Sequence, residues 1–412
     1  MSGQVSCKNI HAMRRIRVVF SIGAMHGGGS ERQIILLLRH LNRETFEPCL
    51  YLVYKTGPLL EQVPSDVPVT SFDTRATSSR IYLPGLMHAR RVRDYARYLR
   101  EAKADVSYDR TFLMTLISAA GARKAGVPNV STIVTHPETG FAAVAGRFQW
   151  FKRRMLHRLY NQSAQVLAVS DGAREAAIRF YGIQQGQIAT LRNGVDLDWV
   201  ESQASLPIAD PWWIATHHGA ASRVFRIVTA GRLNEQKGFH LLIDAIAQVR
   251  QKLPHIEFRL AMLGDGPNRQ TLQQQVHELN LHQAIRLTGF QENAMAWYRS
   301  ADTFVLPSLI EGMPNVLLEA MACGTSVIST NCPSGPAEIL DNGRYGALIP
   351  ANNINAIVDA LVASVNSSDT AKITAAARSH VADHWSAAAA AQKLGEVFLR
   401  CAAANCPTQG FH

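Results

Sequence analysis

Short apolar runs alternate with longer amphipathic segments along the chain. Runs rich in branched apolar residues, such as 15–22 and 225–231, have the length of strands, and glycine-containing loops follow them. Segments with the apolar periodicity of a helix, about 10–15 residues long, come next. This alternation is typical of parallel sheets that helices cover on both faces. We therefore predict an α/β fold.

The same strand–loop–helix start occurs twice. The first, at 14–41, has the loop "GGGSE", in which Ser30 could cap the helix that follows. The second, at 225–249, has the strand "FRIVTAG", a loop and an amphipathic helix. Two such starts predict two α/β units side by side.

The segment with the weakest pattern separates these units. Residues 206–222 are rich in Pro, Ala, Ser and His, so we predict a linker there. The remaining predicted parts are a first domain over 1–205, a second domain over 223–385, and a C-terminal helix and tail over 386–412 whose helix could pack back on the first domain.

Length and composition exclude several classes of protein. The chain has 412 residues, of which 47% are hydrophobic, and no run of apolar residues is long enough to span a membrane. The N-terminal segment lacks the apolar core of a secretory signal. The six cysteines include no CxxC pair, so neither a disulfide framework nor a zinc site is expected. These observations favour the cytoplasm.

The net charge of +10 lies entirely in the first half of the chain. Residues 1–222 hold 27 Lys and Arg against 17 Asp and Glu, whereas residues 223–412 hold 15 of each. The basic segments 90–103 and 151–160 predict helices. These helices could lie on the anionic inner face of a membrane or bind a polyprenyl diphosphate. A solvated basic surface is the alternative. No recognition motif supports nucleic acid as a partner.

The stretch "PSLIEGMPNVLLEAMACG" at 307–324 carries two glutamates around a short predicted helix. Pro314 suits the start of that helix and Gly324 its end. The strand before it places the helix N-terminus at the carboxyl end of a strand, where α/β sheets bind ligands and where free N–H groups favour a phosphate. Glu311 precedes the helix, and Glu319 within it suits a pair of vicinal hydroxyls. This pattern predicts a nucleoside diphosphate sugar as ligand.

Cations are expected beside such phosphates. The loop "GRLNEQKG" supplies Arg232 and Lys237 directly after the first strand of the second half. An arginine can donate to two phosphate oxygens and a lysine adds a compact charge. Both would also stabilise the charge that develops on a leaving diphosphate.

Together these motifs resemble the retaining glycosyltransferases of family 4, glycosyl transferases group 1, which have the GT-B fold of two Rossmann-like domains with a cleft between them. The resemblance covers nearly the whole chain in the family's order. The matching segments are "GGGSE" (27–31), "VS" (169–170), "NGVD" (193–196), "AGRLNEQKG" (230–238), "GDGP" (264–267), residues 301–324 and "CPSGPAEIL" (332–340). The last departs from the glycine pair common in the family, in a form that we associate with bacterial polysaccharide, lipopolysaccharide and lipid-linked glycan enzymes.

The resemblance implies roles for matching residues. The first domain would bind the acceptor and the second the nucleotide sugar, without a metal or other cofactor. The implied catalytic residues are Glu311, near the reacting face of the donor sugar, and His136, after the strand "STIVTH"; a core histidine is the alternative for His136. The implied donor-binding residues are Arg232 and Lys237 at the diphosphate, Glu319 at the ribose, and backbone N–H groups of Gly28, Gly29, Asn315 and Val316 at the phosphates.

The implied activity is transfer of a hexose or N-acetylhexosamine, with retention of configuration, from a UDP-sugar to a glycan or polyprenyl-diphosphate-linked acceptor. Two alternatives remain at this point: another GT-B enzyme such as a nucleotide-sugar epimerase, and a non-catalytic basic module that binds membranes. The literal Asp-x-Asp at 196–198 overlaps "NGVD", so we do not interpret it as a metal site. "GAMHGGG" does not match GxGxxG, which disfavours a nicotinamide enzyme.

Overall fold

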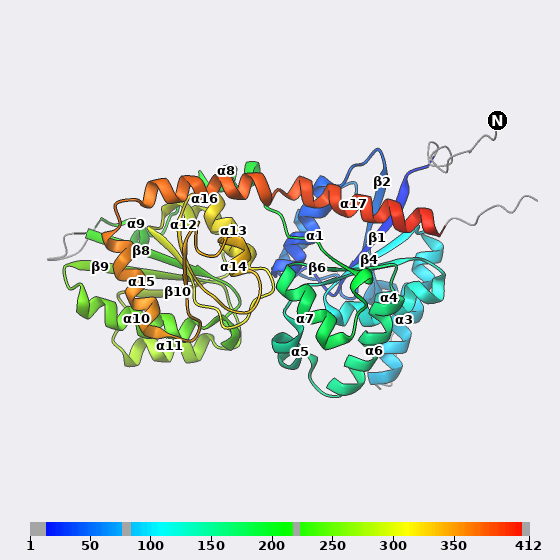
Figure 1. Cartoon of the computed structure of the whole chain (residues 1–412), viewed down its shortest axis with the longest axis horizontal. Coiled ribbons are helices and arrows are strands. Elements are labelled where there is room, and N and C mark those ends of the chain that lie inside the picture. Colours follow the sequence, from blue (N-terminus) through cyan, green and yellow to red (C-terminus); the bar gives the residue numbers. More distant parts are fainter. Residues whose placement is uncertain (1–13, 76–83, 217–222, 406–412) are drawn as a thin grey trace, which may run out of the picture. The chain divides into compact units, whose positions relative to one another are not determined.

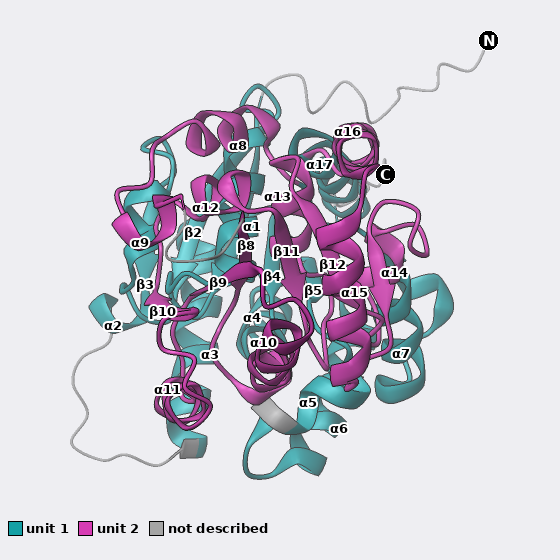
Figure 2. Cartoon of the chain, turned by 90° about the vertical axis from the view of Figure 1, so that its left-hand side faces the viewer, with its two compact units in different colours: residues 1–194, 387–412 teal, residues 195–386 magenta. Residues whose placement is uncertain are grey.

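The computed structural model describes residues 14–75, 84–216 and 223–405. Its chain divides into two compact units, which Figure 2 shows in teal and magenta. Unit 1 comprises residues 1–194 and 387–412, and unit 2 comprises residues 195–386. Part of the predicted linker, 217–222, and part of the predicted tail, 406–412, lie outside the described residues.

Unit 1 contains a seven-stranded sheet in the order β3-β2-β1-β4-β5-β6-β7, and its neighbouring strands are parallel. Strands β1, β2, β4 and β6 of this sheet are labelled in Figure 1. Its strands are β1 (Ile16–Ile22), β2 (Phe46–Leu52), β3 (Val69–Ser71), β4 (Val106–Arg110), β5 (Asn129–Ile133), β6 (Gln165–Ala168) and β7 (Ile188–Thr190). Its helices are α1 (Gly29–His40), α2 (Phe72–Arg75), α3 (Pro84–Glu101), α4 (Phe112–Ala125), α5 (Pro137–Ala145), α6 (Gln149–Gln162), α7 (Asp171–Tyr181) and α17 (Ala387–Ala404), with short 3-10 turns η2 (Pro58–Gln62) and η3 (Gln185–Gln187).

Both faces of this sheet are buried. Successive side chains of a strand point to opposite faces, and helices cover each face. In β1, Val18 and Phe20 belong to a core that includes residues of α1 and α17, whereas Val19 belongs to a second core with residues of α3 and α4. In α17, the Phe398 ring lies 5.8 Å from that of Phe20 and 5.6 Å from that of Tyr108. The C-terminal helix is therefore part of unit 1.

Unit 2 contains a six-stranded parallel sheet in the order β10-β9-β8-β11-β12-β13. Its strands are β8 (Arg223–Ala230), β9 (Ile256–Leu263), β10 (Ile285–Gly289), β11 (Thr303–Leu306), β12 (Ser326–Thr330) and β13 (Ala347–Ile349). Its helices are α8 (Leu197–Ala204), α9 (Pro211–Ile214), α10 (Phe239–Lys252), α11 (Arg269–Glu278), α12 (Ala294–Ser300), α13 (Asn315–Ala322), α14 (Pro336–Ile339), α15 (Ile354–Asn366) and α16 (Thr370–His384), with the 3-10 turn η4 (Glu235–Lys237). The predicted α/β fold with two parallel sheets is confirmed.

The boundary between the units differs from the one placed at residue 205. The structure divides the chain after Gly194, because α8 packs against α12 of unit 2. The segment predicted as linker also contains the packed helix α9. There Asp210 caps the helix, and Trp213 is only 1% exposed and donates a 2.8 Å hydrogen bond from Nε1 to Ser300 Oγ.

The predicted cap of the first helix was wrong. Gly28, with an extended backbone (φ −79°, ψ 167°), is the N-cap of α1, so Ser30 lies within the first helical turn. The Glu31 side chain folds back over this cap. It lies so close that a Cβ added to Gly28 would be 2.5 Å from Glu31 Oε2. A capping carboxylate at this position is well suited to the first turn of a helix.

Among the described helices, none combines the length and apolar character that a membrane span requires.

Candidate functional site

The strand order of unit 2 reverses between β8 and β11. The chain leaves β8 for β9 on one side, whereas β11 lies on the other side of β8. Such a reversal of strand order opens a crevice at the carboxyl ends of the two strands, where α/β sheets bind their ligands. The loops that follow these strands, 231–238 and 307–314, therefore form the walls of a candidate site.

Glycines allow these two loops to touch. Gly238 has φ +63°, and a Cβ added there would lie 2.1 Å from the Pro307 carbonyl oxygen. The backbone N–H of Leu309 donates a 2.8 Å hydrogen bond to the Gln236 carbonyl. A side chain at position 238 would force the loops apart, so glycine is required by both the backbone conformation and the close approach.

Lys237 and Glu311 meet where the loops join. Lys237 Nζ lies 2.6 Å from Glu311 Oε1, although the residues are 74 positions apart in the sequence. Ser308 Oγ donates a second hydrogen bond, of 2.7 Å, to the same oxygen. The Glu311 side chain is 8% exposed and that of Lys237 is 20% exposed. An ammonium group has three hydrogens, so Lys237 can bind Glu311 and still donate to a phosphate.

Helix α13 begins directly after this ion pair. Pro314 is its N-cap, Asn315 and Val316 are its first residues, and Gly324, with φ +77°, follows its end. N–H groups of a first helical turn lack partners within the helix. Glu319 lies one turn after Asn315, and both side chains are 9% exposed.

The loop after β12 supports the same region. Gly335 has φ +93°, and a Cβ there would lie 2.7 Å from Pro314 Cδ and 2.9 Å from the Gly312 carbonyl oxygen. Ser334 Oγ donates a 3.0 Å hydrogen bond to the Glu311 carbonyl. Three loops of unit 2 are therefore packed against one another around the glutamate.

Arg232 lies on the same loop as Lys237, two residues after the end of β8. Its side chain is exposed, and the guanidinium forms no hydrogen bond or ion pair with any residue of the described ranges. The structure thus joins Lys237 to Glu311 and places Glu319 on the neighbouring helix, while Arg232 is available to a ligand.

The remaining predicted residues lie at the carboxyl edge of the sheet in unit 1, where the strand order reverses between β1 and β4. Gly28 and Gly29 start α1 after β1. His136 follows β5 as the N-cap residue of α5, is 8% exposed, and has Nδ1 3.1 Å from Thr139 Oγ1. Burial lowers the pKa of His136, which favours a neutral imidazole at pH 7.

Sequence reasoning missed Arg110 at the end of β4. It is 3% exposed, and its Nη2 donates a 2.8 Å hydrogen bond to Asn193 Oδ1 of the "NGVD" segment. No carboxylate in the described part of the chain pairs with this guanidinium. The available signal was an arginine at the carboxyl end of a strand ("VSYDR"), because a buried cation at a ligand-binding edge is costly unless an anion compensates it.

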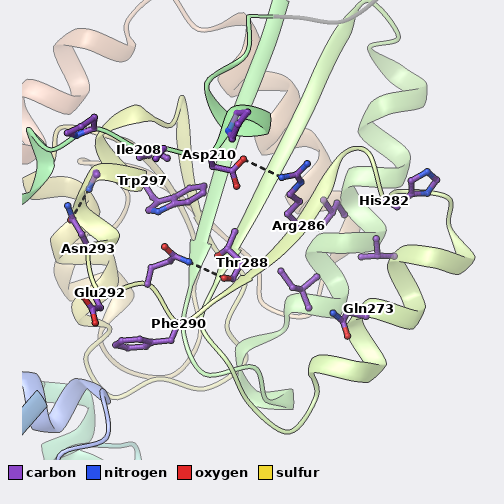
Figure 3. A pocket seen from close by; sticks show the side chains of 18 of the residues that line it. Ile208, Asp210, Gln273, His282, Arg286, Thr288, Phe290, Glu292, Asn293 and Trp297 are labelled. Carbon is purple, nitrogen blue, oxygen red and sulfur yellow. Dashed lines mark hydrogen bonds and ion pairs between the residues drawn. The ribbon is translucent and has the colours of Figure 1, made fainter. Parts of the chain in front are cut away.

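A separate groove of about 1160 Å³ runs along the edge strand β10 (Figure 3). Arg286 Nη1 lies 3.3 Å from Asp210 Oδ1 in this groove, and the Trp297 ring lines it. None of the predicted site residues is in the lining that the structure describes. This hollow marks where the segment before α9 packs along the sheet edge.

No group of three or more His, Cys, Asp or Glu is placed to hold a metal ion within residues 14–75, 84–216 and 223–405.

Two parallel α/β units, each with a reversal of strand order, define the GT-B architecture. The structure of Anabaena HepE in complex with UDP and glucose matches this chain with a TM-score of 0.76 at 20% identity, covering 94% of this chain and 100% of that one. A Staphylococcus aureus TarM structure matches with a TM-score of 0.69 at 12% identity, covering 93% of this chain and 99% of that one. At these identities the likeness shows the fold.

Two family models match successive parts of the sequence. The model "Glycosyltransferase Family 4" covers residues 27–199, and "Glycosyl transferases group 1" covers residues 224–367. Together with the fold, these matches establish that the chain belongs to the glycosyltransferases of family 4 and group 1.

Relatives with assigned names are similar over part of the chain. A D-inositol 3-phosphate glycosyltransferase of Pseudarthrobacter chlorophenolicus is 27% identical over 68% of this chain and 67% of its own length. A Campylobacter jejuni N-acetylgalactosaminyltransferase, named for a diphospho-undecaprenol-linked acceptor, is 27% identical over 55% and 56%. An uncharacterized glycosyltransferase of Methanocaldococcus jannaschii is 40% identical over 28% of each chain. These alignments span 28% to 67% of the relatives' own lengths.

Proposed function

We propose that this protein is a retaining glycosyltransferase. It transfers a hexose or N-acetylhexosamine from a UDP-sugar to a glycan or polyprenyl-diphosphate-linked acceptor in polysaccharide or glycolipid biosynthesis. The observation that carries the proposal is the Lys237–Glu311 pair, 2.6 Å apart at the strand reversal of unit 2, with Glu319 on the adjoining helix. Cation, carboxylates and helix N-terminus together suit a ligand with phosphates between two polyol groups.

Each group has a role in the proposed reaction. Lys237 and Arg232 bind the diphosphate and stabilise the charge that it gains as it leaves. The N–H groups of Asn315 and Val316 bind the same phosphates at the start of α13. Glu319 accepts hydrogen bonds from the ribose hydroxyls.

Glu311 holds the donor sugar near its reacting face. Its carboxylate is fixed by Lys237 and Ser308, so it positions the sugar without rearranging. The acceptor hydroxyl attacks on the face from which the diphosphate departs, and a phosphate oxygen takes its proton.

Unit 1 supplies the acceptor side of the reaction. His136 is neutral at pH 7 through burial, so it can donate or accept one hydrogen bond at the sugar without adding charge. Unit 1 also contributes to donor binding: we assign the N–H groups of Gly28 and Gly29 to the donor phosphates, because neither residue has a side chain of its own that would hold a phosphate away.

The names of related proteins support the choice of substrates. HepE is described in complex with UDP and with UDP-glucose, and the C. jejuni relative is named for an acceptor linked to diphospho-undecaprenol. A lipid-linked acceptor places the enzyme at the inner face of the membrane as a peripheral protein, and the basic first half of the chain fits that location.

A panel of nucleotide sugars tests the proposal. In thermal-shift measurements, UDP and one UDP-sugar should raise Tm more than the other nucleotides of the panel. When that UDP-sugar is incubated with lipid-linked acceptors, UDP should be released only as the sugar is transferred to an acceptor. Calorimetry should show that Glu319→Ala weakens UDP binding at least tenfold. Unchanged UDP affinity in this variant would remove the ribose role, and epimerisation of the sugar without an acceptor would replace the transferase proposal.

A further inference from the structure

Three aromatic side chains are exposed together at the turn between α5 and α6. Phe148 is 77% exposed, Trp150 is 74% exposed and Phe151 is 55% exposed. Single exposed apolar residues are normal on a protein surface, but three large aromatic side chains within four positions form a patch. Such a patch indicates an interaction surface.

The backbone holds this turn in a costly conformation. Gly146 has a positive φ of +60°, and Phe148 has φ +63° and ψ +39°, in the left-handed helical region. For a bulky residue this conformation costs roughly 1–2 kcal/mol. This strained backbone does not serve to bury the Phe148 ring. Among the described residues, Phe148 is the most exposed large apolar side chain. The turn therefore presents this ring to the outside.

Helix α6 continues the patch with cations. Its buried face consists of Leu156, Leu159 and Tyr160. The opposite, exposed face carries Arg154 and Arg158, one turn apart and one turn after Trp150.

These arginines are uncompensated. The side chains of Arg147, before the helix, and of Arg154 and Arg158 form no ion pair or hydrogen bond within the part of the chain that the structure describes. The sequence contains no Asp or Glu between Glu138 and Asp171. The aromatic tip is therefore surrounded by positive charge and is complementary to an anionic surface.

Two other cations of α6 are engaged, since Lys152 donates to the Ala145 carbonyl and Arg153 Nε donates a 2.8 Å hydrogen bond to the Phe180 carbonyl. The other basic helix, α3, has more such contacts. Its Arg91 donates to the Tyr54 hydroxyl, Arg97 Nη2 lies 2.6 Å from Asp94 Oδ1, and Arg100 donates to the Lys124 carbonyl. Most of the α3 arginines are thus engaged within unit 1. The two basic helices look alike in the sequence, and only the structure separates them.

We propose that the α5–α6 turn and α6 form a docking surface for an anionic lipid bilayer. We call this surface the aromatic tip: Phe148, Trp150 and Phe151 with Arg147, Arg154 and Arg158. The rings enter the boundary between headgroups and acyl chains, and the arginines contact the lipid phosphates. Aromatic rings favour this boundary because they are apolar with a polarisable face.

The aromatic tip deepens the proposed function, on which it rests for the lipid-linked acceptor. Helix α5 starts directly after His136 and ends before the tip, and its nine residues span about 14 Å. A headgroup held at the tip is therefore one short helix away from the carboxyl edge of the sheet in unit 1. Docking at this position would bring the acceptor diphosphate from the bilayer to the site.

Vesicle binding by the full chain tests the inference. Vesicles of phosphatidylcholine with 30% phosphatidylglycerol should bind the protein, and vesicles of phosphatidylcholine alone should bind it at least tenfold more weakly. The double variant Trp150→Ala/Phe151→Ala and the triple variant Arg147→Gln/Arg154→Gln/Arg158→Gln should each reduce binding at least tenfold. Added salt should weaken the wild type more than the triple variant. As a matched control, Leu206→Ala/Ile214→Ala removes two exposed apolar side chains of unit 2, which are 48% and 57% exposed, and should bind as the wild type does.

Calorimetry with UDP on the same proteins separates the two proposals. Normal UDP binding with equal vesicle binding by all variants overturns the docking surface and leaves the proposed function intact. Vesicle binding that depends on the tip without any UDP binding keeps the docking surface and removes the proposed function. A concentration-dependent dimer that the Trp150→Ala/Phe151→Ala variant abolishes, without vesicle binding, would assign the tip to a second copy of the chain instead.

Discussion

Replacing Lys237 with alanine should affect stability and turnover through two separate physical effects. The first is the loss of the ion pair, because Glu311 would remain 92% buried with Ser308 as its side-chain donor. Removing one partner of a buried pair costs about 3–5 kcal/mol, and the 20% exposure of Lys237 places this case near the lower limit. For a unit of this size, about 3 kcal/mol lowers Tm by roughly 6–12 °C.

The second effect concerns the leaving diphosphate. If Lys237 stabilises its developing charge, turnover should fall at least about 100-fold, which corresponds to about 2.7 kcal/mol of transition-state free energy. The fall should appear in kcat as well as in kcat/KM, because the contact strengthens as charge develops.

A double variant distinguishes the two effects. Adding Glu311→Gln to Lys237→Ala removes the uncompensated carboxylate charge, so Tm should recover by several degrees while turnover stays low. Lys252→Ala is a matched control, since its pair with Asp359 spans 3.4 Å between exposed side chains and should contribute less than about 1 kcal/mol. Near-normal kcat in folded Lys237→Ala enzyme would refute the catalytic role, and unchanged Tm would refute the structural one.

Three further predictions test other parts of the molecule. Gly238→Ala should destabilise unit 2 and weaken UDP binding, measured by thermal unfolding and calorimetry, because its Cβ would meet the Pro307 carbonyl at 2.1 Å. Trp213→Ala should cost about 3–5 kcal/mol in urea unfolding, since it empties a fully buried site in the segment predicted as linker. Burial lowers the folded-state pKa of His136 below its ordinary 6.5, so the unfolded chain binds more protons and stability falls as pH drops through 6.5. His136→Gln should flatten that fall between pH 7.5 and 5.5, and an unchanged slope would contradict it.

The sequence was sufficient for the alternation of strands and helices and for the presence of two α/β units. The strands predicted at 15–22 and 225–231 correspond to β1 and β8, and the helix expected after Pro314 is α13. These predictions succeeded because a strand buried on both faces and an amphipathic helix leave strong local patterns. The motif at 307–324 likewise predicted a helix N-terminus at the end of a strand, because Pro314 and Gly324 mark the start and the end of the helix.

Long-range packing was beyond local patterns. The pairing of Lys237 with Glu311 joins residues 74 positions apart, and the burial of Trp213 depends on a ring of α12, Trp297, whose centroid is 5.1 Å away. The sequence before Trp213 does contain a helix start, with Asp210 as cap and Pro211 after it, but nothing local shows that the indole is buried. Ser30 was assigned as a cap from composition, but the glycine two positions earlier already has the extended backbone that ends the loop.

The glycines of unit 2 show why its charged groups are fixed. Gly238 and Gly335 lie on loops after different strands. A Cβ added at either position would collide with the loop after β11. That loop carries Glu311, which is tied to Lys237 on one side and, through its carbonyl, to Ser334 on the other. None of these loops can move without breaking a contact to its neighbour. Electrostatic stabilisation of a leaving group requires charges that are already in place, so the close approach that demands glycine also provides the rigidity that the proposed chemistry needs.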